Sequence, residues 1–402
     1  MNVKIYTFPF WGHTEQAIHI ANRLYELGAD ISIDMNLEYI ADIAQGIVVT
    51  ECKYKINRQM CKNNAVSKDS LVGYAESILQ CTASYIEDSD MTFSNADLVI
   101  FDSFAFWGQV LAQINNKKSV ALMTLQPFEE ADFTNKAELI LKQYSDLFAN
   151  KREFERMMHI YEVNARVRYN FCSEFRFGNI FCAKGCSNFV MFPRHMSYFN
   201  ESLGEQYIWG RAFSNDAVHP GLKDERCAYV AFGSILESRE LLVECIDVLL
   251  ESGYEVYAKA GHYFDELCEY YAATGNRVNL FKYAPQKEIL AKATLFITHG
   301  GMNSVMEALI AQTPMIVIPL ANDELINGRM VVQNDYGLVY EGGAKVEKCI
   351  LSDLVLEIQT NRMYRRRLKE DAIVNSECAL ERICAELERI SFIWITKKST
   401  ES

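Results

Sequence analysis

The chain has 402 residues, which is too long for one ordinary domain and fits two of roughly 200 residues each. Half of the residues are hydrophobic and 23% are charged, the balance of an ordinary folded protein, while a net charge of −13 argues against a nucleic-acid partner. No apolar run approaches the length of a membrane span, and the first ten residues do not resemble a secretion signal. We therefore expect a cytoplasmic protein with small-molecule ligands and its twelve cysteines reduced.

The N-terminal segment predicts a strand, a turn, a helix and a second strand. Val3–Phe8 is a short apolar run, Glu15–Leu27 has apolar residues at helical spacing, and Ile31–Ile33 begins the next strand. His13 stands in the turn between the first strand and the helix. An imidazole at such a turn could take a proton from a hydroxyl, but it could equally donate at the helix N-terminus or pack in the loop.

A second polar residue stands at the end of a predicted strand. Asp97–Phe101 is a buried strand that Asp102 follows, before a helix at Gln109–Ile114 and a strand at Val120–Met123. A carboxylate in that position could orient the imidazole of His13 and stabilise its charged form. The position also permits a helix N-cap, and the spacing does not choose between the two.

Large apolar side chains are concentrated in and beside these strand ends. They could line a pocket for an apolar small molecule, although core packing accounts for most residues of this kind. Residues 44–70 are polar and predict a loop, and Pro127–Phe171 predicts a mostly helical region. The candidate pocket residues are Phe10, Trp11, Phe104, Phe106, Trp107, Met123 and Phe128.

The second half of the chain repeats the alternation of strands and helices. His219-Pro220-Gly221 marks a break, so we expect a first domain over residues 1–209, a linker over 210–221 and a second domain over 222–363. Cys227–Phe232 predicts a strand that ends at a glycine turn, Gly233-Ser234. A helix over 364–390 and a tail over 391–402 complete the chain.

The most informative stretch is Tyr283–Asn327. Ala293–Thr298 predicts a buried strand, His299-Gly300-Gly301 ends it, and Asn303–Gln312 predicts a helix. A glycine pair at a strand-to-helix turn lets the backbone approach a ligand closely, and the first helical turn offers unpaired N–H groups and the positive end of the dipole. Phosphate groups bind at such turns.

Polar side chains around this turn could hold the rest of a nucleotide sugar. Ser304 adds a hydroxyl, and Glu307 points the same way one turn later, where a carboxylate could accept hydrogen bonds from a ribose diol. The next predicted strand, Pro314–Pro319, delivers Asp323 and Glu324 to the same edge of a parallel sheet. Adjacent carboxylates suit the recognition of sugar hydroxyls.

The pattern formed by these residues resembles the donor-binding signature of nucleotide-sugar-dependent glycosyltransferases of the GT-B fold, family 1, the macrolide and plant natural-product type. It consists of Tyr-Ala-Pro-Gln, then His-Gly-Gly-x-Asn-Ser-x-x-Glu, then Pro-x-x-x-Asp-Glu-x-x-Asn. The resemblance implies an α/β fold with two Rossmann-like parallel-sheet domains facing across a cleft. It also implies a C-terminal helix that crosses back to the first domain.

The resemblance assigns roles as well. Tyr283 would stack on the base, and Gln286 would contact the base or the ribose. Glu307 would bind the ribose hydroxyls, and Asp323 and Glu324 would bind the transferred sugar. The diphosphate falls to the two glycine turns and the helix start, namely Gly233, Ser234, His299, Gly301, Asn303 and Ser304. The family often has Trp where Tyr283 stands and usually Gln where Glu324 stands, so the sugar stays undetermined.

In the first half, Phe10-Trp11-Gly12-His13 resembles the family's catalytic turn, and Phe101-Asp102-Ser103 resembles its partner-aspartate strand end. The family turn often continues with Asn-Pro, whereas Glu15-Gln16 follows here.

These features predict an inverting transfer of a sugar from a nucleotide diphosphate sugar, UDP-glucose or a related UDP-hexose, to a hydroxyl of a small, largely apolar acceptor. His13 would deprotonate the acceptor and Asp102 would steady His13. We expect no metal and no cofactor besides the nucleotide sugar, because the helix dipole and hydrogen-bond donors can stabilise the leaving diphosphate. The alternatives are a non-catalytic auxiliary or binding protein of the same fold, and a sugar-nucleotide epimerase or hydrolase.

Overall fold

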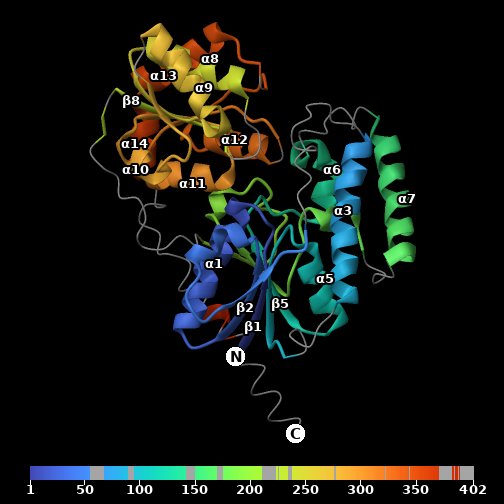
Figure 1. Ribbon diagram of the computed structural model, residues 1–402. Coiled ribbons are helices and arrows are strands. Elements are labelled where there is room, and N and C mark those ends of the chain that lie inside the picture. Colours follow the sequence, from blue (N-terminus) through green and yellow to red (C-terminus); the bar gives the residue numbers. More distant parts are fainter. Residues whose placement is uncertain are drawn as a thin grey trace. The chain divides into compact units, whose positions relative to one another are not determined.

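The computed structural model divides into two compact units, and Figure 1 shows their elements. Unit 1 comprises Met1–Glu138, Tyr144–Asn215 and Glu377–Ser402, and unit 2 comprises Leu139–Gln143 and Asp216–Ser376. The predicted domain boundaries stay a prediction, because residues 211–221 of the expected linker lie outside the described part of the chain. The structure describes residues 1–54, 68–88, 95–141, 150–169, 175–210, 223–224, 226–233, 238–275, 278–321, 323–343, 345–370, 383, 385–387 and 389.

Unit 1 is built on a parallel sheet with the strand order β3-β2-β1-β4-β5-β6-β7. The chain fills one side of β1 first and then continues on the other side with β4, so the switch point of the sheet lies between β1 and β4. The strands are β1 (Asn2–Tyr6), β2 (Asp30–Met35), β3 (Val48–Glu51), β4 (Leu98–Asp102), β5 (Lys118–Met123), β6 (Ser187–Val190) and β7 (Tyr207–Trp209).

Helices cover both faces of this sheet, with α1 on one side and α3, α5 and α7 on the other (Figure 1). The apolar face of α1 packs on β1, β2 and β4 in one core that also contains Ile383 and Leu387 from the C-terminal segment. The helical elements are α1 (Trp11–Glu26), η1 (Leu37–Asp42), α3 (Lys68–Glu87), α5 (Phe106–Ile114), α6 (Glu130–Ile140), α7 (Lys151–Tyr169), η3 (Phe177–Ile180) and η4 (Arg194–Met196).

Unit 2 is built on a second parallel sheet, with the order β10-β9-β8-β11-β12-β13 and its switch point between β8 and β11. The strands are β8 (Cys227–Ala231), β9 (Glu255–Lys259), β10 (Val278–Phe281), β11 (Leu295–Thr298), β12 (Met315–Val317) and β13 (Gly337–Val339). The helical elements are α8 (Arg239–Glu251), η5 (Gly261–Tyr263), α9 (Phe264–Thr274), α10 (Gln286–Lys292), α11 (Met302–Ile310), α12 (Glu324–Gln333), α13 (Lys348–Thr360) and α14 (Met363–Glu370). The predicted class, α/β with two parallel sheets, is confirmed.

The prediction of a loop over residues 44–70 is wrong at both ends. β3 pairs with β2 as the edge strand, and α3 begins at Lys68. An edge strand has only one neighbour, and the side chains of β3 are largely exposed, so its sequence lacks the continuous apolar run of the central strands. Polar residues around a short edge strand therefore hid it.

Two helices begin earlier than predicted. α1 begins at Trp11 and α5 at Phe106, each with an N-cap residue whose side chain makes no capping hydrogen bond. Aromatic residues are weak N-terminal signals, so tertiary packing rather than a cap fixes these starts. One consequence is that His13 lies in the first turn of α1 rather than in a loop before it.

The C-terminal segment returns to unit 1. The predicted helix over 364–390 is described as α14, and residues 371–382 lie outside the described part of the chain. Farther on, Ile383 and Leu387 are buried in the core of unit 1, which agrees with the expected crossing back. Within the described residues, no helix has the length and hydropathy needed to cross a membrane.

Candidate active site

His13 and Asp102 meet at the switch point of the first sheet. β1 and β4 are neighbours, His13 lies in the helix that follows β1, and Asp102 is the last residue of β4. The Nδ1 atom of His13 lies 3.0 Å from both carboxylate oxygens of Asp102, whose side chain is fully buried while that of His13 is 14% exposed. A carboxylate can only accept, so the ring hydrogen sits on Nδ1. The lone pair of Nε2 is then the one that can take a proton.

Thr124 joins this pair and was missed in the sequence analysis. Its hydroxyl donates to Oδ2 of Asp102 at 2.8 Å and lies 2.9 Å from Nδ1 of His13. Thr124 directly follows β5, the strand next to β4, so the signal available in the sequence was a third polar residue close after a strand. Polar residues that follow neighbouring parallel strands collect at one edge.

The rival interpretation of Asp102 as a helix N-cap is wrong. The N-cap of α5 is Ala105, and no side chain caps that helix. Oδ1 of Asp102 instead accepts the backbone N–H of Phe104 at 2.8 Å, which leaves the carboxylate fixed by a backbone donor, a hydroxyl and an imidazole. For His13, the imidazole bonds to a carboxylate and not to the helix start, so the alternative of an N-terminal donor does not hold.

Aromatic rings surround His13. Its ring centroid lies 5.5 Å from that of Phe8, 6.4 Å from that of Phe10 and 5.4 Å from that of Phe104. Trp11 is exposed, and Phe10 and Phe104 are partly exposed. These three predicted pocket residues therefore reach solvent near His13. The rings of Phe10 and Phe104 contact His13, and Trp11 is close to it in sequence.

The other predicted pocket residues are core residues. Trp107 and Met123 have no exposed surface, and Phe106 and Phe128 are buried as well. Trp107 stacks against Tyr85, at a centroid distance of 5.6 Å. Packing therefore accounts for these four side chains, which is the alternative that the sequence had left open.

In unit 2, the expected phosphate turn lies at the corresponding place in the second sheet. Gly233 follows β8, His299 follows β11, and these two strands flank the switch point. A Cβ atom on Gly233 would lie 2.9 Å from Nε2 of His299, and one on Gly301 would lie 2.5 Å from it. The ring of His299 thus fits between two glycines, and neither position has room for a side chain.

His299 is held in its neutral form. Burial, and after it the positive charge of Lys259, lowers the pKa of His299 to about 4. The Nζ of Lys259 donates to the carbonyl oxygen of Gly233 at 2.9 Å, which places a cation at the end of β9 beside the same turn. The sequence analysis missed Lys259, which is the last residue of β9. A neutral imidazole here can donate a hydrogen bond but supplies no charge.

The residues expected to hold the ribose form a connected cluster. The side-chain amide of Gln286 donates to Glu307 Oε2 at 2.7 Å and to Ser304 Oγ at 3.2 Å, and its oxygen accepts the hydroxyl of Tyr229 at 3.2 Å. Burial raises the pKa of Glu307. α10 and α11 therefore bring Gln286, Ser304 and Glu307 together, and Tyr283, next to this cluster in sequence, is 84% exposed.

The two carboxylates expected at the sugar are engaged by the protein. Oδ2 of Asp323 accepts from the amide of Asn327 at 3.0 Å, and that amide also donates to the carbonyl of Gly300 at 2.9 Å. Oε2 of Glu324 accepts the backbone N–H groups of Leu320 at 2.6 Å and Ala321 at 2.7 Å. The Asp323–Asn327 link ties the loop after β12 to the glycine turn. Ser234 lies outside the described residues, and Asn303 is partly exposed in the first turn of α11.

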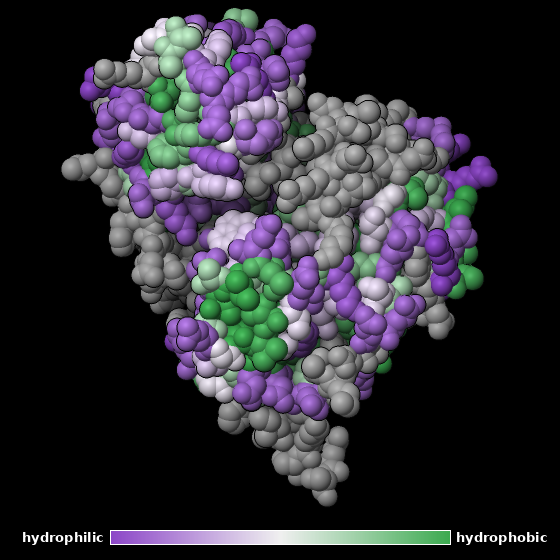
Figure 2. Space-filling model, in the orientation of Figure 1, coloured by the Kyte–Doolittle hydropathy of each residue, from purple (hydrophilic) through white to green (hydrophobic). Residues whose placement is uncertain are grey.

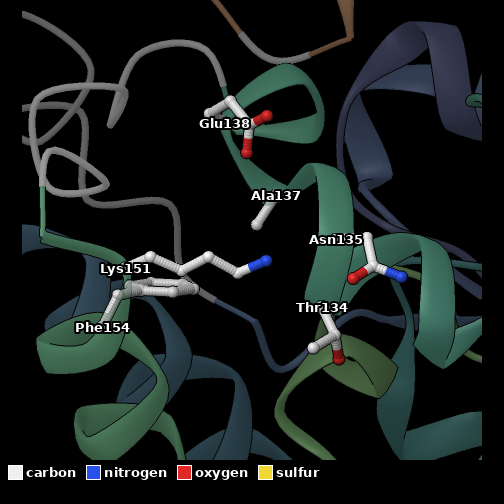
Figure 3. A pocket seen from close by; sticks show the side chains of 6 residues that line it. All are labelled: Thr134, Asn135, Ala137, Glu138, Lys151 and Phe154. Carbon is white, nitrogen blue, oxygen red and sulfur yellow. The ribbon is translucent and has the colours of Figure 1, made fainter.

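A separate pocket of about 210 Å³ lies between α6 and α7 (Figure 3). Its lining comes from other elements than those that hold His13 or His299, and in Figure 3 the amine of Lys151 extends across it. Figure 2 shows an apolar patch on the same unit near α1 and β2. The pocket contains no predicted site residue. The pocket residues are Thr134, Asn135, Ala137, Glu138, Lys151 and Phe154.

Within the described ranges, no group of three or more His, Cys, Asp or Glu side chains is arranged to hold a metal ion.

Comparison with solved structures defines the fold class. The match to CalG4, the calicheamicin glycosyltransferase, covers 96% of this chain and 97% of that one, with a TM-score of 0.72 and 17% sequence identity. The match to the glycotransferase of kitacinnamycin covers 96% of this chain and 98% of that one, with a TM-score of 0.71 and 19% sequence identity. The whole chain therefore has the GT-B fold.

Comparison of sequences finds glycosyltransferases among the relatives of the chain. Residues 234–381 match the glycosyltransferase family 28 C-terminal domain. The chain is 24% identical to the uncharacterized UDP-glucosyltransferase YojK of Bacillus subtilis (strain 168), over 92% of both chains, and 24% identical to the NDP-glycosyltransferase YjiC of the same strain, over 96% of both. These matches, together with the GT-B fold, support the resemblance to UDP-sugar glycosyltransferases seen in the sequence.

Proposed function

We propose that the protein is an inverting UDP-sugar-dependent hexosyltransferase that glycosylates a hydroxyl group of a small, largely apolar acceptor. The observation that carries this proposal is the bonding of His13 to the buried Asp102, because it leaves a basic ring nitrogen in a partly exposed aromatic setting. In a single displacement, Nε2 of His13 takes the hydroxyl proton as the acceptor oxygen attacks the anomeric carbon. The bond to the diphosphate breaks on the opposite side, which inverts the anomeric centre.

The donor site is assigned to unit 2. The glycine turns and the start of α11 suit a diphosphate, since N–H groups and the helix dipole stabilise the charge that develops on the leaving group. Glu307, held by Gln286, suits the ribose hydroxyls. UDP-glucose is the donor we favour, because the relative YojK carries the name UDP-glucosyltransferase. No metal is needed for this scheme, as neutral donors and Lys259 can serve the diphosphate.

The acceptor is assigned to the aromatic surface around His13. Phe10, Trp11 and Phe104 offer flat apolar faces near the base, and such faces suit an aromatic or polyketide-like hydroxyl compound.

Thermal unfolding with UDP, dTDP, UDP-glucose and UDP-N-acetylglucosamine tests the donor site first. A ligand that binds only the folded state at one hundred times its Kd adds about 2.7 kcal/mol of stability. We expect the UDP compounds to raise Tm in the wild type and not in Glu307→Ala, with Glu288→Ala on the same stretch as the matched control. A preference for dTDP would change the assigned base, and no stabilisation by any nucleotide would contradict the proposal.

Transfer itself is then tested with UDP-glucose and a panel of phenols and apolar alcohols, with products resolved by mass spectrometry and by the anomeric coupling in NMR. We expect a β-glucoside from the α-linked donor. An α-glucoside would contradict inversion. Hydrolysis of the donor with no glycoside from any acceptor would favour the hydrolase alternative.

A further inference from the structure

We infer that Thr124 is a third member of the catalytic unit, a positioning residue that fixes the carboxylate of Asp102 and the ring of His13 for proton transfer. This inference rests on the proposed function. It starts from three mutual distances: 2.8 Å from Thr124 Oγ1 to Asp102 Oδ2, 2.9 Å from Thr124 Oγ1 to His13 Nδ1, and 3.0 Å from His13 Nδ1 to each carboxylate oxygen.

The hydrogens can be arranged in only one consistent way. Thr124 has one hydroxyl hydrogen, and it is donated to Asp102, which has none to give. The hydroxyl oxygen can then only accept from Nδ1 of His13. Both neighbours of Nδ1 are acceptors, so the hydrogen of the neutral imidazole is confined to Nδ1 and Nε2 is left as the base.

The hydroxyl also completes the carboxylate. Oδ1 of Asp102 accepts the N–H of Phe104, and Oδ2 accepts the hydroxyl of Thr124, so each oxygen has a donor of its own besides the shared imidazole. The side chain of Asp102 is fully buried and that of Thr124 nearly so. Without the hydroxyl, a buried charged oxygen would keep only a share of the imidazole hydrogen, and the carboxylate would lose the symmetric orientation seen here.

The backbone around Thr124 explains why this residue can hold the pair in place. It follows β5, whose register with β4 sets Asp102 opposite Leu122, and β4 is in turn registered with β1 ahead of His13. The three polar groups therefore come from the ends of three adjacent strands, and their separation is set by the hydrogen bonds of the sheet.

The test compares Thr124→Val, which keeps the shape and removes the hydroxyl, with Thr124→Ser, which keeps the hydroxyl. We expect Thr124→Val to lower kcat about tenfold while KM for the UDP-sugar and the stabilisation by UDP stay unchanged. Thr124→Ser should restore kcat to within about twofold of the wild type, because Ser keeps the same donor and acceptor. The inference would be overturned by a wild-type kcat in Thr124→Val or by a Thr124→Ser variant as slow as Thr124→Val. A change confined to the KM of the donor would also overturn it, because it would indicate a contact with the sugar instead.

A spectroscopic measurement separates this inference from the proposed function. In protein labelled with 15N-histidine, and with His13→Gln used to assign the signal, the Nδ1–H proton of His13 should be visible in wild type and Thr124→Ser and lost to solvent exchange in Thr124→Val. This signal does not depend on turnover. If the wild type transfers no sugar yet shows the expected pattern, the function fails and the positioning role stands; an Nδ1–H signal equally protected in Thr124→Val contradicts the positioning role alone.

Discussion

Each sheet places a histidine beside its switch point, and the two rings have opposite properties. His13 follows β1 and meets the end of β4, while His299 follows β11 and meets the end of β8, and each pair of strands flanks the switch point of its sheet. His13 faces a carboxylate and a hydroxyl, which are both acceptors toward it. His299 lies between two glycines, with its pKa lowered to about 4 by burial and by Lys259.

The difference teaches that the topology supplies the position and the neighbours supply the chemistry. Parallel strands bring their carboxyl ends to one edge, so polar residues after adjacent strands meet in both units. An acidic partner makes the imidazole of His13 suitable as a base. Burial and a nearby cation keep the imidazole of His299 neutral, as the proposed donor site requires. The assignments below follow from this contrast.

The largest expected effect separates the two histidines by function. His13→Ala should lower kcat about a thousandfold, because general bases contribute factors of this order, and should leave stabilisation by UDP unchanged. His299→Ala should instead weaken UDP binding. Steady-state kinetics and thermal unfolding with UDP read the two effects separately. Loss of UDP binding in His13→Ala, or an unchanged kcat in that variant, would contradict the separate roles proposed for the two histidines.

The next effect concerns the space around His299. Gly301→Ala would place a Cβ atom 2.5 Å from Nε2 of His299, so the ring must move, and we expect UDP affinity to fall about fiftyfold, as for the loss of roughly two good hydrogen bonds. Isothermal titration with UDP measures this. An affinity within about twofold of the wild type would show that the ring position does not matter for binding.

A pair of variants isolates contact from backbone strain in the same region. Gly233 and Gly275 have nearly the same left-handed backbone, with φ of +75° and +73°, but a Cβ atom on Gly275 meets nothing within 4 Å. Gly233→Ala and Gly275→Ala should therefore lose similar stability from strain, about 1 kcal/mol. Only Gly233→Ala should also lose UDP affinity. An equal loss of UDP affinity in both variants would show that backbone strain, and not the contact with His299, causes the effect.

The lowered pKa of His299 predicts a pH dependence of stability. In the folded protein this ring stays neutral down to about pH 4, whereas in the unfolded chain it binds a proton near the ordinary histidine pKa of 6.5. The unfolded state therefore takes up the extra proton between these values, so the stability present above pH 6.5 is lost as the pH falls toward 4. The contribution is about 3 kcal/mol.

Urea unfolding of the wild type and of His299→Gln between pH 7 and pH 4.5 measures this term by difference, since all other groups titrate in both proteins. The wild type should lose more stability on acidification than the variant. Parallel pH curves would contradict the neutral, buried state of His299 and weaken the contrast with His13.

Much of the fold and part of the site could be predicted from the sequence, for physical reasons that the failures make clear. Buried parallel strands such as β4 and β11 are continuous apolar runs, so their ends, and with them Asp102 and His299, could be located. β3 could not, because an exposed edge strand lacks that run. Trp107 and Phe128 were placed in a candidate pocket because an aromatic in a core and one in a pocket have the same local sequence. Thr124 and Lys259 became visible only when the order of the strands brought their ends together.

The smallest expected effect tests the proposed role of Lys259 in UDP binding. Lys259→Met keeps most of the side-chain volume and removes the cation that lies beside the glycine turn, bonded to Gly233. A single positive charge near a solvated diphosphate is worth about 1 kcal/mol, so UDP affinity should fall about fivefold, and the loss should shrink at high salt. Lys292→Met, which removes a lysine that lies over the ring of Tyr257, is the matched control and should leave UDP affinity unchanged. Because Lys259 also lowers the pKa of His299, the Met variant should raise the pH at which His299 takes up a proton. A variant that binds UDP like the wild type, at every salt concentration, would remove Lys259 from the proposed diphosphate site.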